Sequence, residues 1–157
     1  MLSVCEGGSV ITLDQVETRD NLRVVSDIGS RLPIYCTSQG KVFLAHMSRT
    51  SAEALLRAQH MTQFTPHTIT DPAALMQEID LCRTDGYAIE NGEYKIGLRS
   101  ISAPVYTVER KARYTVGVIG MFRSTRSDEF LAAVEQVCAA ASMISTALGY
   151  RKTEELL

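Results

Sequence analysis

Two long β-rich segments near the end of the chain, residues 99–108 and 113–122, constrain its fold more than any other feature. Both are rich in Val, Ile, Tyr and Thr, the residue types that favour strands. Only the charged run 109–112 separates them, which is long enough for a turn and too short for a crossover helix. The two segments are therefore predicted to pair as an antiparallel hairpin.

A second hairpin is predicted at the start of the chain, across residues 2–17. Gly7 and Gly8 supply the turn, and the segment after it is rich in β-branched side chains. A further strand is predicted at residues 22–26. The chain is thus expected to have antiparallel pairing near both ends.

The segment between the two β regions has helical rather than alternating periodicity. Thr37 or Ser38 is expected to cap a short helix. Asp71 and Pro72 are typical of a helix start, and Gly86 of a helix end. The other predicted elements are a short helix from about Ser51, a loop at 62–70, a strand at 87–90 and a closing helix at 127–148. The closing helix has an apolar stripe made of Phe130, Val134, Val137, Ala141, Ile144 and Leu148.

This order of strands, helices, strands and helix predicts an α+β fold rather than a doubly wound parallel sheet. The natural candidate is a sensor-type antiparallel sheet of about six strands, similar to GAF and profilin folds, with helices packed on it. One face of the sheet would hold the helices and the other could carry a pocket. All 157 residues are expected to form a single domain.

Composition excludes several classes of protein. The net charge of −2 and the pI near 5.9 argue against a dominant nucleic-acid surface. No stretch approaches the roughly 20 apolar residues of a membrane span, so a cytoplasmic protein without a membrane partner is expected. The four cysteines and three histidines form no CxxC, HxxxH or HExxH pair. The sequence therefore predicts no disulfide, no metal site and no cofactor.

Catalytic motifs are mostly absent. Gly40 and Lys41 resemble the end of a phosphate loop, but the surrounding residues do not fit that motif. A nucleophilic pair of Cys36 and His46 is conceivable without any orienting third group. Three nearby acids, Asp85, Glu90 and Glu93, could act in acid–base chemistry or simply form a solvated loop edge.

Residues 33–41 are more informative, because small polar residues lead directly into the predicted short helix. The main-chain N–H groups of Ser38, Gln39 and Gly40 would then point out of its first turn. Such a helix start stabilises an anion, for example a carboxylate. Ordinary helix capping would produce the same sequence, so both interpretations stay open at this point.

The chain resembles the IclR family of bacterial transcription regulators. Residues 29–41 with Phe43 and Ala45 are similar to its G-x-R-x-P-L-H-A-x-x-x-G-K-x-x-L-A signature. Residues 86–88 with Glu93, and then 97–105, are similar to the G-[YF]-A…E…G-[VL]-R-C-[IL]-A-A-P-V block. The closing segment 144–149 also fits, so the matches run through nearly the whole chain in order.

The resemblance implies a regulator with an N-terminal winged helix-turn-helix and a C-terminal effector-binding domain, of which this chain is the second part. It would meet DNA only through the missing N-terminal domain, and it would perform no catalysis. Family members assemble as dimers and tetramers, so a homodimer or homotetramer is expected.

The resemblance also implies a set of ligand-binding residues. The amides that hold the effector carboxylate fall on Ser38 and Gln39, and two polar positions fall on Glu90 and Ser100. Apolar wall positions fall on Val24, Leu32 and Leu98. Two further positions, which are serines in some family members, fall on Ile119 and Met121. The alignment of this last strand leaves a shift of one residue open.

An anionic ligand would be repelled by Glu90 unless that carboxylate accepts hydrogen bonds from ligand hydroxyls. The hypothesis is therefore a small hydroxy acid, such as a sugar acid of the aldonate type. Two alternatives are a GAF-like sensor that serves another output domain, and a small enzyme that uses Glu90 and Glu93 with Cys36.

Overall fold

The computed structural model describes residues 1–17 and 27–152, and within these ranges the chain forms six strands and four helices. The strands form one antiparallel sheet in the order β3-β2-β1-β6-β5-β4. This confirms the predicted α+β class. The elements are β1 (Leu2–Glu6), β2 (Ser9–Asp14), β3 (Arg31–Pro33), α1 (Ser38–Ala45), α2 (Arg49–Ala58), α3 (Pro72–Asp85), β4 (Ala88–Asn91), β5 (Arg99–Tyr106), β6 (Ala112–Gly120) and α4 (Asp128–Ala147).

Both predicted hairpins are present. Gly7 and Gly8 have φ angles of 57° and 75° in the turn between β1 and β2, a left-handed conformation that glycine adopts without strain. The strand predicted at residues 22–26 lies outside the described residues. The third strand at this end of the sheet is β3, whose three residues, ending in a proline, gave too short a pattern to be predicted.

The helix ends follow the capping residues of the sequence. Thr37 caps α1, and Asp71 accepts hydrogen bonds from two N–H groups in the first turn of α3. Gly86, at φ 79°, ends α3 in the left-handed conformation. The second helix begins at Arg49, earlier than predicted, because Ser48 is its cap.

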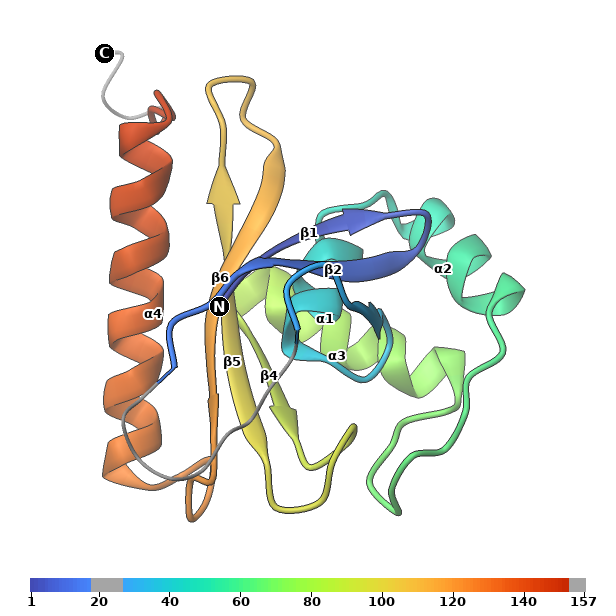
Figure 1. The fold of residues 1–157 in the computed structure, drawn as a ribbon. Helices are drawn as coiled ribbons and strands as arrows, with labels where there is room; N and C mark the ends of the chain where they lie inside the picture. Colours follow the sequence, from blue (N-terminus) through green and yellow to red (C-terminus); the bar gives the residue numbers. More distant parts are fainter. Residues whose placement is uncertain (18–26, 153–157) are drawn as a thin grey trace.

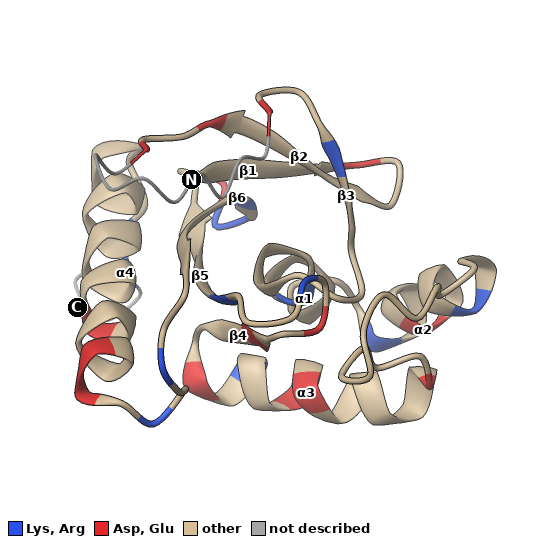
Figure 2. Cartoon of the chain, turned by 60° about the horizontal axis from the view of Figure 1, so that its bottom comes forward, with Lys and Arg blue, Asp and Glu red and all other residues tan. Residues whose placement is uncertain are grey.

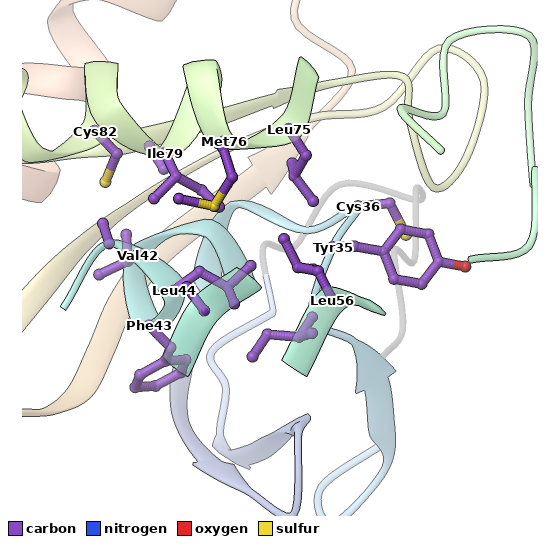
Figure 3. Packing of buried hydrophobic residues seen from close by; sticks show 14 of the residues in the cluster. Tyr35, Cys36, Val42, Phe43, Leu44, Leu56, Leu75, Met76, Ile79 and Cys82 are labelled. Carbon is purple, nitrogen blue, oxygen red and sulfur yellow. The ribbon is translucent and has the colours of Figure 1, made fainter. Parts of the chain in front are cut away.

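Helices cover both faces of the sheet. Helix α4 packs along β5 and β6, while α1, α2 and α3 lie on the opposite side (Figure 1). The expectation that one face would be left for a pocket is therefore wrong. On the α1 side, Val42 and Leu44 of α1 face Leu75, Met76 and Ile79 of α3 across an apolar layer (Figure 3).

Strand β5 lies between the two helical layers and alternates between them. Its odd-numbered residues Ile101, Ala103 and Val105 belong to the apolar core under α4. The intervening Ser100 and Ser102 are also buried, and each contacts the hydroxyl of Ser38 directly on the α1 side. One strand thus presents an apolar face to α4 and a polar face to α1.

Helix α4 corrects two expectations. Its buried residues include Phe130, Val137 and Ala141 as predicted, but Leu148 lies beyond its end with 44% of its surface exposed. By length and composition, the helix is also long and apolar enough to span a membrane. No such segment was expected from the sequence. The charges of α4 gather at its beginning (Figure 2), and one side of it packs on the sheet, with Phe130, Val137 and Ala141 buried in that contact.

Candidate ligand-binding site

A cavity of about 240 Å³ lies between the start of α1 and the sheet. At about 30 Å³ per water molecule, this volume would hold about eight waters, which is the size range of a small metabolite. The side walls come from β3, the ends of β5 and β6, and the turn between β4 and β5. The lining residues are Met1, Asp27, Ser30, Arg31, Leu32, Thr37, Gln39, Glu90, Tyr94, Lys95, Leu98, Ser100 and Ile119.

The start of α1 forms the hydrogen-bond donor side of the cavity. Among the described residues, neither the N–H of Ser38 nor that of Gln39 donates a hydrogen bond. The N–H of Gly40 donates to Thr37 Oγ1 at 3.2 Å, so the expectation of a third free amide is wrong. The first turn contains no acidic side chain, so the partial positive charge of the helix start is left for another group to balance.

The sequence fixes this helix start against the chain that precedes it. Thr37 Oγ1 donates to the carbonyl of Pro33 at 2.8 Å, and Tyr35 and Cys36 are buried in the core between them. A side chain at Gly40 would overlap the carbonyl oxygen of Ile34. The close approach of the two backbone segments therefore requires glycine at this position.

Glu90 forms the acceptor side of the cavity and is 2% exposed. Its Oε1 accepts hydrogen bonds from the N–H groups of Glu93 and Tyr94, the latter at 3.1 Å. Its Oε2 is 3.2 Å from the hydroxyl of Ser100. Burial raises the pKa of Glu90, assisted by the charge of Glu93, while the two main-chain N–H groups and Ser100 act in the opposite direction.

Three serine hydroxyls continue from Glu90 into the sheet. Ser100 Oγ lies 2.8 Å from Ser38 Oγ, which lies 2.8 Å from Ser102 Oγ. Ser100 has one hydroxyl hydrogen and two acceptors, Ser38 and Glu90, so it can donate to only one of them at a time. Ser38 is fully buried and is not among the residues that line the cavity, whereas its neighbours Thr37 and Gln39 are.

A buried ion pair supports the site, and sequence reasoning missed it. Lys41 is 1% exposed, and its ammonium lies 2.6 Å from Glu93 Oε1, 3.2 Å from the carbonyl of Ile89 and 3.6 Å from Glu78 Oε2. The signal available was Lys41 itself, the single charged residue of α1. Its place beside Gly40 led only to the rejected phosphate-loop interpretation.

The predicted apolar walls are partly observed. Leu32, Leu98 and Ile119 line the cavity, and Val24 lies outside the described residues. Met121 follows the end of β6 with 63% of its surface exposed and is not brought to the cavity. Ile119 pairs with Ser100, which places one of the two expected positions at the site and the other beyond it.

Several lining residues had no signal in the sequence. Arg31 is near the cavity, but its guanidinium bonds the carboxylate of Glu6 at 3.2 Å and the carbonyl of Glu6 at 3.3 Å. Tyr94 and Lys95 enter through the turn after β4, and the Lys95 ammonium lies 6.0 Å from the centre of the Tyr94 ring. Their positions depend on how that turn folds back over the cavity, which residue types alone do not show.

The geometry does not assemble a nucleophilic pair. Burial raises the pKa of the Cys36 thiol to about 12, so it remains protonated at neutral pH. His46, at the other end of α1, lies 2.7 Å from the hydroxyl of Tyr106 and 2.8 Å from the carbonyl of Val42. Across residues 1–17 and 27–152, no group of three or more His, Cys, Asp or Glu side chains could hold a metal ion.

Comparison with known proteins agrees with this fold. Residues 1–146 match the family described as "Bacterial transcriptional regulator IclR C-terminal". The transcriptional regulator BhcR of Paracoccus denitrificans is 31% identical over 151 residues, which are 96% of this chain and 54% of that protein. The regulator KdgR of Escherichia coli is 32% identical over 157 residues, covering 95% of this chain and 57% of KdgR.

Solved structures show the same architecture. The C-terminal domain of E. coli KdgR has a TM-score of 0.84 at 27% identity, covering 95% of this chain and 86% of that one. The Thermotoga maritima IclR structure has a TM-score of 0.85 at 29% identity, covering 95% and 60%. An IclR homologue from Microbacterium hydrocarbonoxydans, solved with 4-hydroxybenzoate, has a TM-score of 0.83 and covers 94% and 59%; at 24% identity the likeness concerns the fold.

The fold and the matched family define the class of this protein: a domain of a transcription regulator, and not an enzyme. The chain belongs to the IclR family and corresponds to its C-terminal domain. It spans about half the length of the curated relatives that it matches, which are named as transcriptional regulators and repressors. This sets aside the interpretation of a small enzyme.

Proposed function

We propose that this chain is the effector-binding domain of a bacterial IclR-type regulator and that its effector is a small hydroxy acid, such as a sugar acid of the aldonate type. The carboxylate of the acid binds at the amides of Ser38 and Gln39. Its hydroxyls bind at Glu90 and Ser100. The observation that carries the proposal is one cavity with a helix start on one side, whose N–H groups at Ser38 and Gln39 have no partner in the described part of the chain, and a buried carboxylate on the other.

The donor side suits an anion. Two adjacent main-chain N–H groups at the start of a helix can each donate to a carboxylate oxygen, and the helix dipole adds favourable charge. No Lys or Arg side chain is required for this. Leu32, Leu98 and Ile119 provide an apolar wall for the carbon chain of the acid.

The acceptor side restricts which acids fit. A second carboxylate beside Glu90 would be repelled, and a carbonyl group would place one acceptor against another. A ligand hydroxyl, in contrast, can donate to Glu90 Oε2, which within residues 1–17 and 27–152 accepts a hydrogen bond from Ser100 alone. The arrangement therefore favours an acid with at least one hydroxyl over the corresponding oxo acid.

The output of the domain depends on the rest of the regulator. Effector binding shifts the population of arrangements of a homodimer or homotetramer and so controls DNA binding by an attached helix-turn-helix domain. The regulator acts in the cytoplasm, where metabolic acids and DNA are both present. The relatives' names as transcriptional regulators support this assignment.

A thermal-shift screen of small carboxylic acids, followed by calorimetry, tests the proposal, because a ligand that binds only the folded state raises its apparent stability. We expect an aldonate such as gluconate to bind, and Glu90→Gln to weaken that binding by about tenfold, the equivalent of one hydrogen bond to a charged group. Glu53→Gln, on the surface of α2, is the matched control and should leave the affinity unchanged. Equal affinity of the Glu90→Gln chain would contradict the hydroxyl-acceptor role.

A further inference from the structure

The two sides of the cavity belong to different parts of the chain. The donor amides of Ser38 and Gln39 are at the start of α1, and Glu90 is at the end of β4. A ligand that binds both sides must match the separation between them. Whatever fixes this separation decides which acids fit.

Glu90 is oriented by the turn that follows it. The N–H groups of Glu93 and Tyr94 hold Glu90 Oε1. From the outer side, the hydroxyl of Thr65 donates to the carbonyl of Gly92 at 2.7 Å, and that of Thr68 donates to the carbonyl of Glu93 at 2.6 Å. The turn and the carboxylate of Glu90 therefore move as one unit.

One buried contact joins this turn to α1. Lys41 lies one helical turn after Ser38, and its ammonium reaches Glu93 Oε1 at 2.6 Å. The other oxygen, Glu93 Oε2, is buried without a hydrogen-bond partner among the described residues. The carboxylate of Glu93 is thus held through Lys41 alone, and the same ammonium also bonds the carbonyl of Ile89 in β4 at 3.2 Å.

We propose that Lys41 is a positioning residue of the effector site: its ion pair with Glu93 fixes the acceptor side relative to the donor side and so determines the length of the acid that fits. This inference rests on the proposed function. Lys41 is not among the lining residues and does not touch the ligand. It acts by holding α1 and the turn at one distance.

The lysine fits this role better than an apolar residue would. A buried ion pair adds little net stability, because removing two charges from water costs about as much as their attraction returns. It does, however, favour one geometry, since both charges must meet at a single short distance. A well-packed apolar pair at the same place would tolerate small shifts of the turn.

The test measures preference for ligand length. The four aldonates glycerate, threonate, xylonate and gluconate, with three to six carbons, serve as probes in calorimetry with the 157-residue chain. The double variant Lys41→Met/Glu93→Gln removes both charges, so no uncompensated buried charge remains, and Thr65 and Thr68 still hold the main chain of the turn. Arg49→Met, which breaks surface ion pairs with Glu53 and Asp80 away from the cavity, is the control.

For the unaltered chain and the Arg49→Met control, we expect the best-fitting aldonate to bind at least about tenfold more tightly than the worst. In the double variant this ratio should fall to about threefold or less. A variant that is merely less stable would bind all four acids more weakly by the same factor and leave the ratio unchanged. That result would overturn the positioning role, while the proposed function would stand. If no aldonate binds to the unaltered chain, the proposed function fails, and the positioning role fails with it.

Discussion

The two faces of β5 show how one sheet can combine stability with binding. Toward α4, the strand contributes Ile101, Ala103 and Val105 to a core without a buried charge. Toward α1, it contributes Ser100 and Ser102 to a layer that contains Glu90, Lys41 and Glu93. The first face is stabilised by apolar burial, whereas the second has buried polar groups that must each find a partner.

This difference explains where the cavity lies. Apolar side chains pack closely and leave little space, so the core under α4 is a poor environment for a polar ligand. The α1 face contains polar groups whose partners are incomplete, namely the amides of Ser38 and Gln39 and one oxygen of Glu90. The cavity therefore lies where polar groups of the α1 face are exposed to it.

The largest effect on stability is expected on the apolar face. Phe130 is 1% exposed and meets the ring of Phe122 edge-on at a centroid distance of 5.1 Å. Phe130→Ala should lower the free energy of unfolding by about 4 kcal/mol, because it leaves a cavity in a close-packed core. Urea unfolding measures this loss of stability. Under conditions in which the variant is fully folded, its affinity for the effector should not change. A loss under 1 kcal/mol would show that this face is not packed as described.

A somewhat smaller effect is expected from a charge on the polar face. Lys41→Met leaves Glu93 buried without its partner and should lower the free energy of unfolding at pH 7 by about 3 kcal/mol. Adding Glu93→Gln should restore most of the stability. If the double variant is as unstable as Lys41→Met, the loss comes from packing and not from charge.

The smallest effect is a pH dependence at Glu90. Because burial raises its pKa above the unfolded value, the folded chain binds this proton more tightly, and the contribution of Glu90 to stability falls as the pH rises through the folded pKa. Glu90→Gln should remove that part of the slope. Urea unfolding of both chains between pH 4 and 8 should therefore show the variant gaining stability relative to the unaltered chain as the pH rises. Parallel curves would mean that Glu90 is not destabilised by burial.

Much of the fold could be predicted because local signals agree with the tertiary structure. The Gly7–Gly8 turn, the Asp71 cap and the Gly86 helix end each act within a few residues. Strand β3 was missed because three residues carry no measurable alternation. The pocket was assigned to an open face because helical periodicity does not tell which side of a sheet a helix covers.

Some of the residues expected at the site line the cavity, and others do not. The expected residues that line the cavity fall on motifs with a fixed place in the fold, and they are Leu32, Gln39, Glu90, Leu98, Ser100 and Ile119, whereas Ser38 does not line it. Lys41 was missed because lysine is rarely buried and its partner Glu93 is distant in the sequence. Met121 was placed wrongly because β6 ends before it.

The central claim is that an organic acid binds at the start of α1 and at Glu90, on the polar face of the sheet. The most direct measurement is the change in the backbone amide NMR resonances of the chain when gluconate is added. We predict that the amide resonances of Ser38 and Gln39 shift most, together with those of Glu93 and Tyr94, while those of α4 hardly change. Shifts concentrated in α4, with Ser38 and Gln39 unchanged, would contradict it.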